Sequence, residues 1–162
     1  MRRFAILAVA ALLGMALPAA TAARTVVSVP GQAGWVDTGI NVEIGDELPV
    51  TTNGYVLTAS IPAWHVPGVF KGASGPNGQV NYGRTCGAVW DTYDEDLKAI
   101  VGECAARDAY FGTLVGKVGD TTFSIGDTDT ITAPASGRLY LGVNDYVLTY
   151  WDNHGAFTVL FG

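Results

Sequence analysis

The sequence predicts an all-β protein, a single domain folded as an antiparallel β-sandwich over residues 24–162. Most of this stretch consists of short segments in which apolar and polar residues alternate, the pattern of a half-buried strand. Turn residues, above all Gly followed by Asp, separate the segments at regular intervals, as in sandwiches and barrels. No window carries apolar residues at helical spacing with caps at both ends, so long helices are not expected.

The first 23 residues have the pattern of a secretory signal peptide. Arg2 and Arg3 precede an apolar run from Phe4 to Leu17, and small residues follow from Ala19 to Ala23. The run is too short to span a bilayer comfortably, and no later segment is long and apolar enough, so no transmembrane segment is expected. An uncleaved anchor is the less favoured alternative, because Ala-x-Ala-like spacing follows directly. We expect a secreted or periplasmic protein.

Charge argues against two classes of partner. Removal of the two arginines takes the formal net charge from -6 to -8. An acidic chain of this kind has no electrostatic reason to bind nucleic acid or anionic lipid.

The strands of the N-terminal half are expected at Thr25–Val29, Ile40–Ile44, Leu48–Thr52 and Tyr55–Ile61. Gly45-Asp46 lies between two alternating segments and predicts a hairpin there. Asn53-Gly54 predicts a second turn.

The strands of the C-terminal half are expected at Tyr110–Val118, Thr121–Ile125, Asp129–Ala133, Arg138–Val143 and Ala156–Phe161. The segment from Asp94 to Val101 is compatible with a short helical turn at most.

Residues 62–107 form a long inserted loop between these halves, and the loop contains both cysteines. Export favours a disulfide between Cys86 and Cys104, which would contribute about 3 kcal/mol by closing a loop of roughly 20 residues. A free pair and a metal pair are the alternatives, although neither Cys-x-x-Cys spacing nor a nearby His favours zinc. Either a functional loop or a disulfide-clamped insertion of no direct function fits this stretch.

The strongest cluster of chemistry-bearing residues is the oxygen-rich segment 144–155, which lies between two expected strands. Within ten residues it gathers Asn144, Asp145, Thr149, Asp152 and Asn153. Calcium needs six to eight oxygen ligands, and a loop between two strands can direct several oxygens at one point. The segment is not an EF-hand, because Tyr150 stands where that loop needs Gly. An ordinary polar loop remains the alternative, because turns collect Asn, Asp and Gly without metal.

Several stretches in order resemble the bacterial PA-I-type galactose-binding lectins and related exported β-sandwich domains. They are Trp35–Ile40, Gly75–Gly78, Asp108–Gly119, and Ala133–Asp145 running into Asp152–Val159. The resemblance implies a β-sandwich of jelly-roll type with calcium in the loop 145–153, bound by Asp145, the Thr149 carbonyl, Asp152 and Asn153. A further backbone carbonyl is implied from the segment after Gly54.

The resemblance also implies that two neighbouring hydroxyls of a sugar complete the calcium shell, as a hard cation with open positions allows. The residues expected at the sugar are Asp145, Tyr146, Thr149, Asp152, His65 and Trp151. The chain departs from the family where a sugar-contacting His-Pro-x-Gln is replaced by Ala99–Gly102, so specificity for a galactose-like sugar is not carried over. His65 is either a substitute from the inserted loop or a solvated side chain.

Among the tryptophans, Trp151 is the best platform for the apolar face of a sugar, because it lies inside the candidate metal loop. Trp35 is expected in the core, and the roles of Trp64 and Trp90 are left open.

The sequence therefore favours a secreted, calcium-dependent, carbohydrate-binding protein that is not an enzyme, and a homo-oligomer is compatible with it. An exported structural or protein-binding module without sugar activity is the alternative. Neither a Gly-x-Ser-x-Gly elbow nor His-Glu-x-x-His is present. A glycosidase that uses Asp145 and Asp152 as its carboxylate pair is the third hypothesis.

Overall fold

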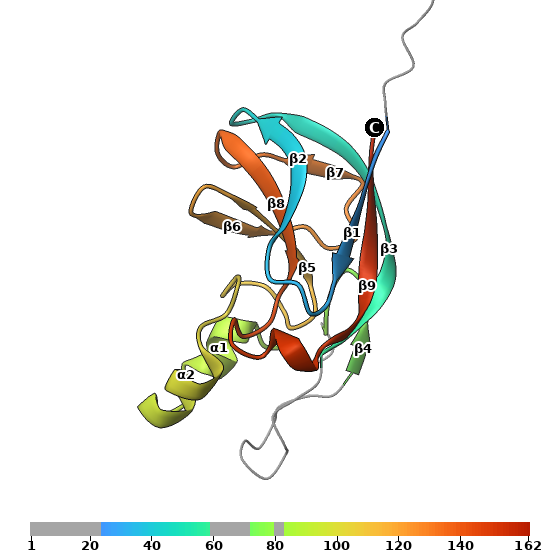
Figure 1. Ribbon diagram of the computed structural model, residues 1–162. Coiled ribbons are helices and arrows are strands. Elements are labelled where there is room, and N and C mark those ends of the chain that lie inside the picture. Colours follow the sequence, from blue (N-terminus) through green and yellow to red (C-terminus); the bar gives the residue numbers. More distant parts are fainter. Residues whose placement is uncertain (1–23, 59–71, 80–82) are drawn as a thin grey trace, which may run out of the picture.

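The computed structural model describes residues 24–58, 72–79 and 83–162. The expected signal peptide 1–23, as well as Trp64 and His65, lies outside the described residues. In the described part, two antiparallel sheets pack face to face, with short helices at one end (Figure 1), which confirms the all-β sandwich. The same residues contain no helix that is long and apolar enough to cross a membrane.

The first sheet has the order β1 (Thr25–Pro30), β9 (His154–Phe161), β3 (Glu47–Thr58), β4 (Gly72–Ser74), and β7 (Thr130–Thr132) pairs with the start of β3. The second sheet has the order β2 (Val36–Val42), β8 (Gly137–Val143), β5 (Leu114–Val118), β6 (Thr121–Ser124). The described helices are α1 (Cys86–Trp90), α2 (Glu95–Val101) and the 3-10 helix η2 (Tyr150–Asp152).

The main core lies between the two sheets and follows the alternation of the strands. On β9, Phe157 and Val159 face inward and are fully buried, while Thr158 between them is exposed. Leu114 and Leu141 meet them from the opposite sheet and are also fully buried. Burial of each such side chain contributes about 1.5–3 kcal/mol.

The predicted hairpin between residues 40–44 and 48–52 is wrong, because the two strands belong to different sheets. β2 pairs with β8, whereas β3 pairs with β7, β9 and β4. Gly45, with φ +88°, does reverse the chain, and its N–H donates to the Ala133 carbonyl at 2.8 Å. The turn therefore carries the chain from one sheet to the other.

The turn predicted at Asn53-Gly54 is also wrong, because β3 runs without interruption through it. The register of β3 on β9 is continuous from Val50 opposite Phe161 to Leu57 opposite His154. Gly54 has φ +105°, and a Cβ there would lie 2.3 Å from the Ala156 carbonyl oxygen. Gly is needed here for close approach of two strands rather than for a turn.

The inserted stretch is more structured than the sequence suggested. Thr85 caps α1 by accepting the Ala88 N–H at 3.3 Å, and Asp94 caps α2 by accepting the Leu97 N–H at 2.9 Å. The stretch therefore holds a helix that was not predicted and a seven-residue helix where a single turn was expected. The strand expected from Tyr110 begins only at Leu114.

Candidate functional site

The oxygen-rich segment leaves β8 after Val143 and reaches β9 at His154, at the end of the sandwich where α1 and α2 lie (Figure 1). Asn144 fixes its first residue. The Asn144 side chain is fully buried, donates to the Ala109 and Tyr110 carbonyls at 2.9 and 3.0 Å, and accepts the Ala106 N–H at 2.8 Å. With both sides of its amide bonded, Asn144 holds the start of the loop in one orientation.

Asp145 is a buried carboxylate with only 4% of its surface exposed. Its Oδ1 accepts the Tyr146 N–H at 2.7 Å, whereas Oδ2 is buried and has no hydrogen-bond partner among the described residues. Burial and, to a smaller degree, the nearby charge of Asp152 raise the pKa of Asp145 to about 7. The Tyr146 N–H, Asn153 and Thr149 act in the opposite direction and lower this pKa. The protein alone thus leaves this negative charge poorly compensated.

The other predicted calcium ligands lie beside Asp145. Thr149 is buried, and its carbonyl accepts the Asp152 N–H at 3.2 Å. Asn153 is fully buried and donates to the Gly31 carbonyl at 3.1 Å, and its Oδ1 has no partner among the described residues. Thr149, Asp152 and Asn153 all influence the pKa of Asp145, so the four predicted ligands lie in one neighbourhood.

The segment after Gly54, which was expected to add a carbonyl, also reaches this neighbourhood. A Cβ on Gly31 would lie 2.9 Å from Cγ1 of Val56 and 3.1 Å from Cβ of Asn153. Val56 on β3 and Asn153 therefore pack against the same glycine.

This donor set fits a hard cation rather than a transition metal. In the described part of the chain, no three His, Cys, Asp or Glu side chains gather as a metal cluster. Two carboxylates, one amide oxygen and main-chain carbonyls remain, and these are ligand types that calcium takes. A buried carboxylate oxygen and a buried amide oxygen without partners are what such an ion would satisfy.

Two predicted sugar-contacting residues have opposite environments. Trp151 is 73% exposed, so its ring is available to a ligand. Tyr146 is 2% exposed, and its ring lies 5.7 Å from that of Tyr93 and 5.0 Å from that of Phe111. A contact between Tyr146 and a sugar would therefore fall to main-chain atoms.

Tyr150 is a residue of this neighbourhood that the sequence analysis missed. Its hydroxyl is buried without a partner among the described residues, and burial followed by the charge of Asp145 raises its pKa above the usual value. The only sequence signal was its place inside the oxygen-rich segment.

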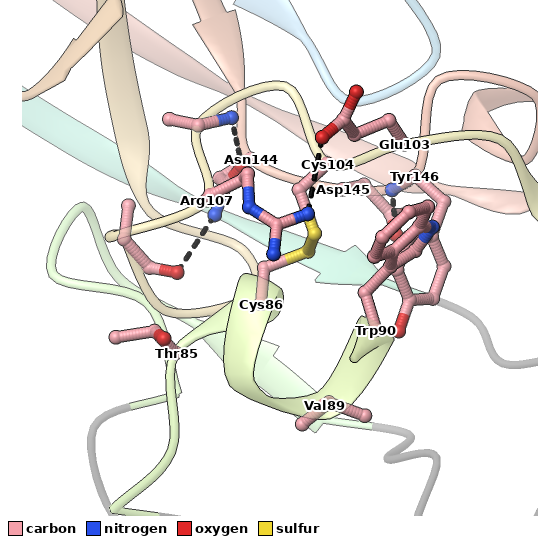
Figure 2. Close-up of a disulfide and its surroundings, with 12 residues drawn as sticks. Thr85, Cys86, Val89, Trp90, Glu103, Cys104, Arg107, Asn144, Asp145 and Tyr146 are labelled. Carbon is pink, nitrogen blue, oxygen red and sulfur yellow. Dashed lines mark hydrogen bonds and ion pairs between the residues drawn. A yellow bond between two sulfur atoms is a disulfide. The ribbon is translucent and has the colours of Figure 1, made fainter. Parts of the chain in front are cut away.

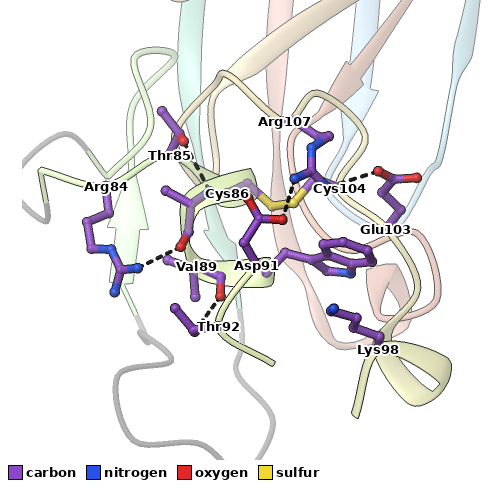
Figure 3. Close-up of polar contacts among 12 residues, drawn as sticks. Arg84, Thr85, Cys86, Val89, Asp91, Thr92, Lys98, Glu103, Cys104 and Arg107 are labelled. Carbon is purple, nitrogen blue, oxygen red and sulfur yellow. Dashed lines mark hydrogen bonds and ion pairs between the residues drawn. A yellow bond between two sulfur atoms is a disulfide. The ribbon is translucent and has the colours of Figure 1, made fainter. Parts of the chain in front are cut away.

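The inserted stretch borders the site, and Cys86 and Cys104 form the predicted disulfide there (Figure 2). Trp90 donates through Nε1 to the Gly102 carbonyl at 2.8 Å, and Lys98 and Arg107 lie over its ring. Arg107 also pairs with Asp91 and Glu103 (Figure 3). Trp90 therefore has a structural role. Trp35 is half-buried against Ala106, Ala109 and Val115, close to the core position expected.

Comparison with known proteins gives a similar fold and no sequence family. No protein-family model matches the chain, and no curated protein does. Among solved structures, the chain is similar to the EclA N-terminal domain, described as a PllA-like lectin. The two share 20% sequence identity with a TM-score of 0.54, over 84% of this chain and 93% of that chain. At this identity the likeness shows a lectin-like β-sandwich fold.

Proposed function

We propose that this chain is a secreted carbohydrate-binding protein whose sugar site depends on calcium. The proposal rests above all on Asp145, a buried carboxylate with an unbonded Oδ2 and Asp152 close by. The lectin-like fold supports the carbohydrate part, and the disulfide is of the kind that persists after export.

The residues have separate tasks in this proposal. Asp145, Asp152 and Asn153 hold the ion through side-chain oxygens, and Thr149 does so through its carbonyl. Bound calcium would supply open coordination positions for neighbouring hydroxyls of a sugar. The carboxylates accept hydrogen bonds from the same hydroxyls, and the exposed ring of Trp151 packs against the apolar face of the sugar.

Titration calorimetry with calcium chloride tests the metal site directly. The metal-free protein should bind calcium at micromolar to millimolar concentrations and give a measurable heat of binding. Addition of EDTA should remove the bound calcium. Asp145→Asn should abolish the uptake. Wild-type protein that takes up no calcium at millimolar concentration would remove the proposal.

An exported module without sugar activity is the second candidate, and one observation favours it. At the positions that replace the family's sugar-contacting motif, Val101 is fully buried and Ile100 exposes an apolar side chain. Neither side chain can form the hydrogen bonds that a galactose-like sugar needs. A glycan array in calcium buffer separates the two candidates, because intact calcium binding with a blank array would favour this one.

A further inference from the structure

The end of α2 and the segment that follows it run beside the candidate loop and pair with it around one β-bridge. The Leu148 N–H donates to the Val101 carbonyl at 3.0 Å, and the Val147 N–H donates to the Glu103 carbonyl at 2.9 Å. In the other direction, the Ala105 N–H donates to the Asp145 carbonyl at 3.0 Å. Cys104 lies opposite Tyr146 as an antiparallel bridge at the centre of this pairing.

The start of the insertion is in turn bonded to its own end and to the segment that leads into β5. The Cys86 N–H donates to the Ala109 carbonyl at 2.9 Å, and the Gly87 N–H donates to the Arg107 carbonyl at 2.8 Å. The disulfide joins the first residue of α1 to Cys104, the residue of the β-bridge, and Figure 2 shows Tyr146 beside it.

The insertion also has a hydrophobic cluster of its own, which includes one residue of the loop. Cys86, Val89, Tyr93, Val101 and Cys104 enclose Tyr146, the residue next to Asp145. None of these residues belongs to the cluster between the sheets. The loop is thus held from the insertion side by hydrogen bonds and by a buried ring, and the disulfide ties the two halves of the insertion to each other.

We propose that the insertion 83–107 is a positioning element that keeps the 144–153 loop in its ion-binding shape. This inference rests on the cation site proposed above. The Cys86–Cys104 disulfide fastens this element. A loop that is already ordered loses little conformational entropy when an ion binds, so its affinity is higher than that of a mobile loop with the same ligands.

The first test compares wild type with Cys86→Ser/Cys104→Ser. Calcium affinity by calorimetry should fall about tenfold in the double variant, because the loop must now be ordered by the ion. Hydrogen exchange in EDTA supplies a readout that needs no ion: the Ala105, Val147 and Leu148 amides should lose protection. The amides of β1 and β9 should keep theirs, because the sandwich has a separate core.

The second test leaves the disulfide intact. A Cβ on Gly102 would lie 2.8 Å from Cγ2 of Val147 and 2.9 Å from Cγ of Leu148, so Gly102→Ala presses the insertion against the loop. Gly119→Ala is the matched control, because Gly119 also has a positive φ but no atom within 4 Å of its Cβ position. Calcium affinity should fall about threefold or more in the first variant and stay unchanged in the second.

Wild-type affinity and wild-type amide protection in the cysteine variant would overturn the positioning role. If the cysteine variant also loses amide protection in β1 and β9, its sandwich is disturbed and the two glycine variants provide the test. Equal calcium affinities of Gly102→Ala and Gly119→Ala would then overturn the positioning role. A wild-type protein without calcium uptake would instead remove the proposed function, and the exchange data would still decide whether the insertion holds the loop.

Discussion

At the level of single residues, the energetic cost of the site is concentrated on Asp145. In the metal-free protein its pKa is about 7, above the ordinary value of 3.8, because burial disfavours the charge. Between about pH 4 and 7 the folded protein holds a proton that the unfolded chain releases. The free energy of unfolding therefore falls as the pH rises through this window, and it stays low above it.

Asp145→Asn should remove this penalty. In EDTA at pH 8 we expect the variant to be more stable than wild type by about 3 kcal/mol, and at pH 4 the difference should nearly vanish. Urea unfolding at the two pH values measures this difference in the free energy of unfolding. Asp120→Asn, in the exposed β5–β6 turn, is the control. Equal pH dependence of wild type and Asp145→Asn would contradict the assignment.

Trp151 tests the sugar side of the site without disturbing the fold. Its ring is 73% exposed, so Trp151→Ala should leave the free energy of unfolding nearly unchanged. Glycan affinity should fall about tenfold through loss of the ring face, while calcium affinity should persist. Ile44→Ala is the control, because Ile44 is 71% exposed in the β2–β3 turn. Unchanged glycan affinity would assign the platform to another residue.

Among the structural elements, β3 shows what alternation can and cannot predict. The alternating pattern identified most strands, because each has one buried face. The pairing predicted for β3, with residues 40–44, was wrong, because pairing depends on contacts between distant residues, such as Val50 opposite Phe161 on β9. A Gly-Asp turn reverses the chain whether the next strand pairs with its neighbour or joins the other sheet.

Helix α1 was missed for a related reason. Its five residues, from Cys86 to Trp90, include Gly87 and the β-branched Val89, so propensity does not favour a helix. The Thr85 cap, the disulfide and burial of Val89 hold it in place instead.

The candidate site was predicted in composition but only partly in arrangement. The carboxylates and amides of residues 145–153 were recognisable from their density in the sequence. The burial of Tyr146 and the approach of Tyr150 to Asp145 were not, because both depend on the inserted stretch and the sandwich packing around the loop.

Gly54 tests the corrected path of β3. If the chain turned there, Gly54→Ala would be mild. In the continuous strand a Cβ would collide with the Ala156 carbonyl oxygen, so we expect a loss of about 2–4 kcal/mol in the free energy of unfolding. Gly39→Ala, at φ +78° with no atom within 4 Å, should cost only about 1 kcal/mol. Urea unfolding of both variants measures the difference, and equal losses would argue against the close approach.

At the scale of the whole molecule, the core between the sheets and the main cluster of the insertion are separate hydrophobic clusters. Leu141 lies in the cluster between the sheets and Val101 in the cluster of the insertion, and both are fully buried. A cluster that covers one end of the sandwich can open without unfolding the rest, as cooperative units in proteins do.

The two clusters should therefore respond differently to the loss of buried methyl groups. Leu141→Ala should lower global stability by about 2–5 kcal/mol and reduce the hydrogen-exchange protection of all the strands. Val101→Ala should mainly release the amides of residues 101–106 and 145–148, because the strands of β1 and β9 do not depend on it. Exchange measured by mass spectrometry on both variants resolves the two patterns. A uniform loss of protection in Val101→Ala would mean that insertion and sandwich unfold as one unit, and the loop at 144–153 would then be as stable as the core.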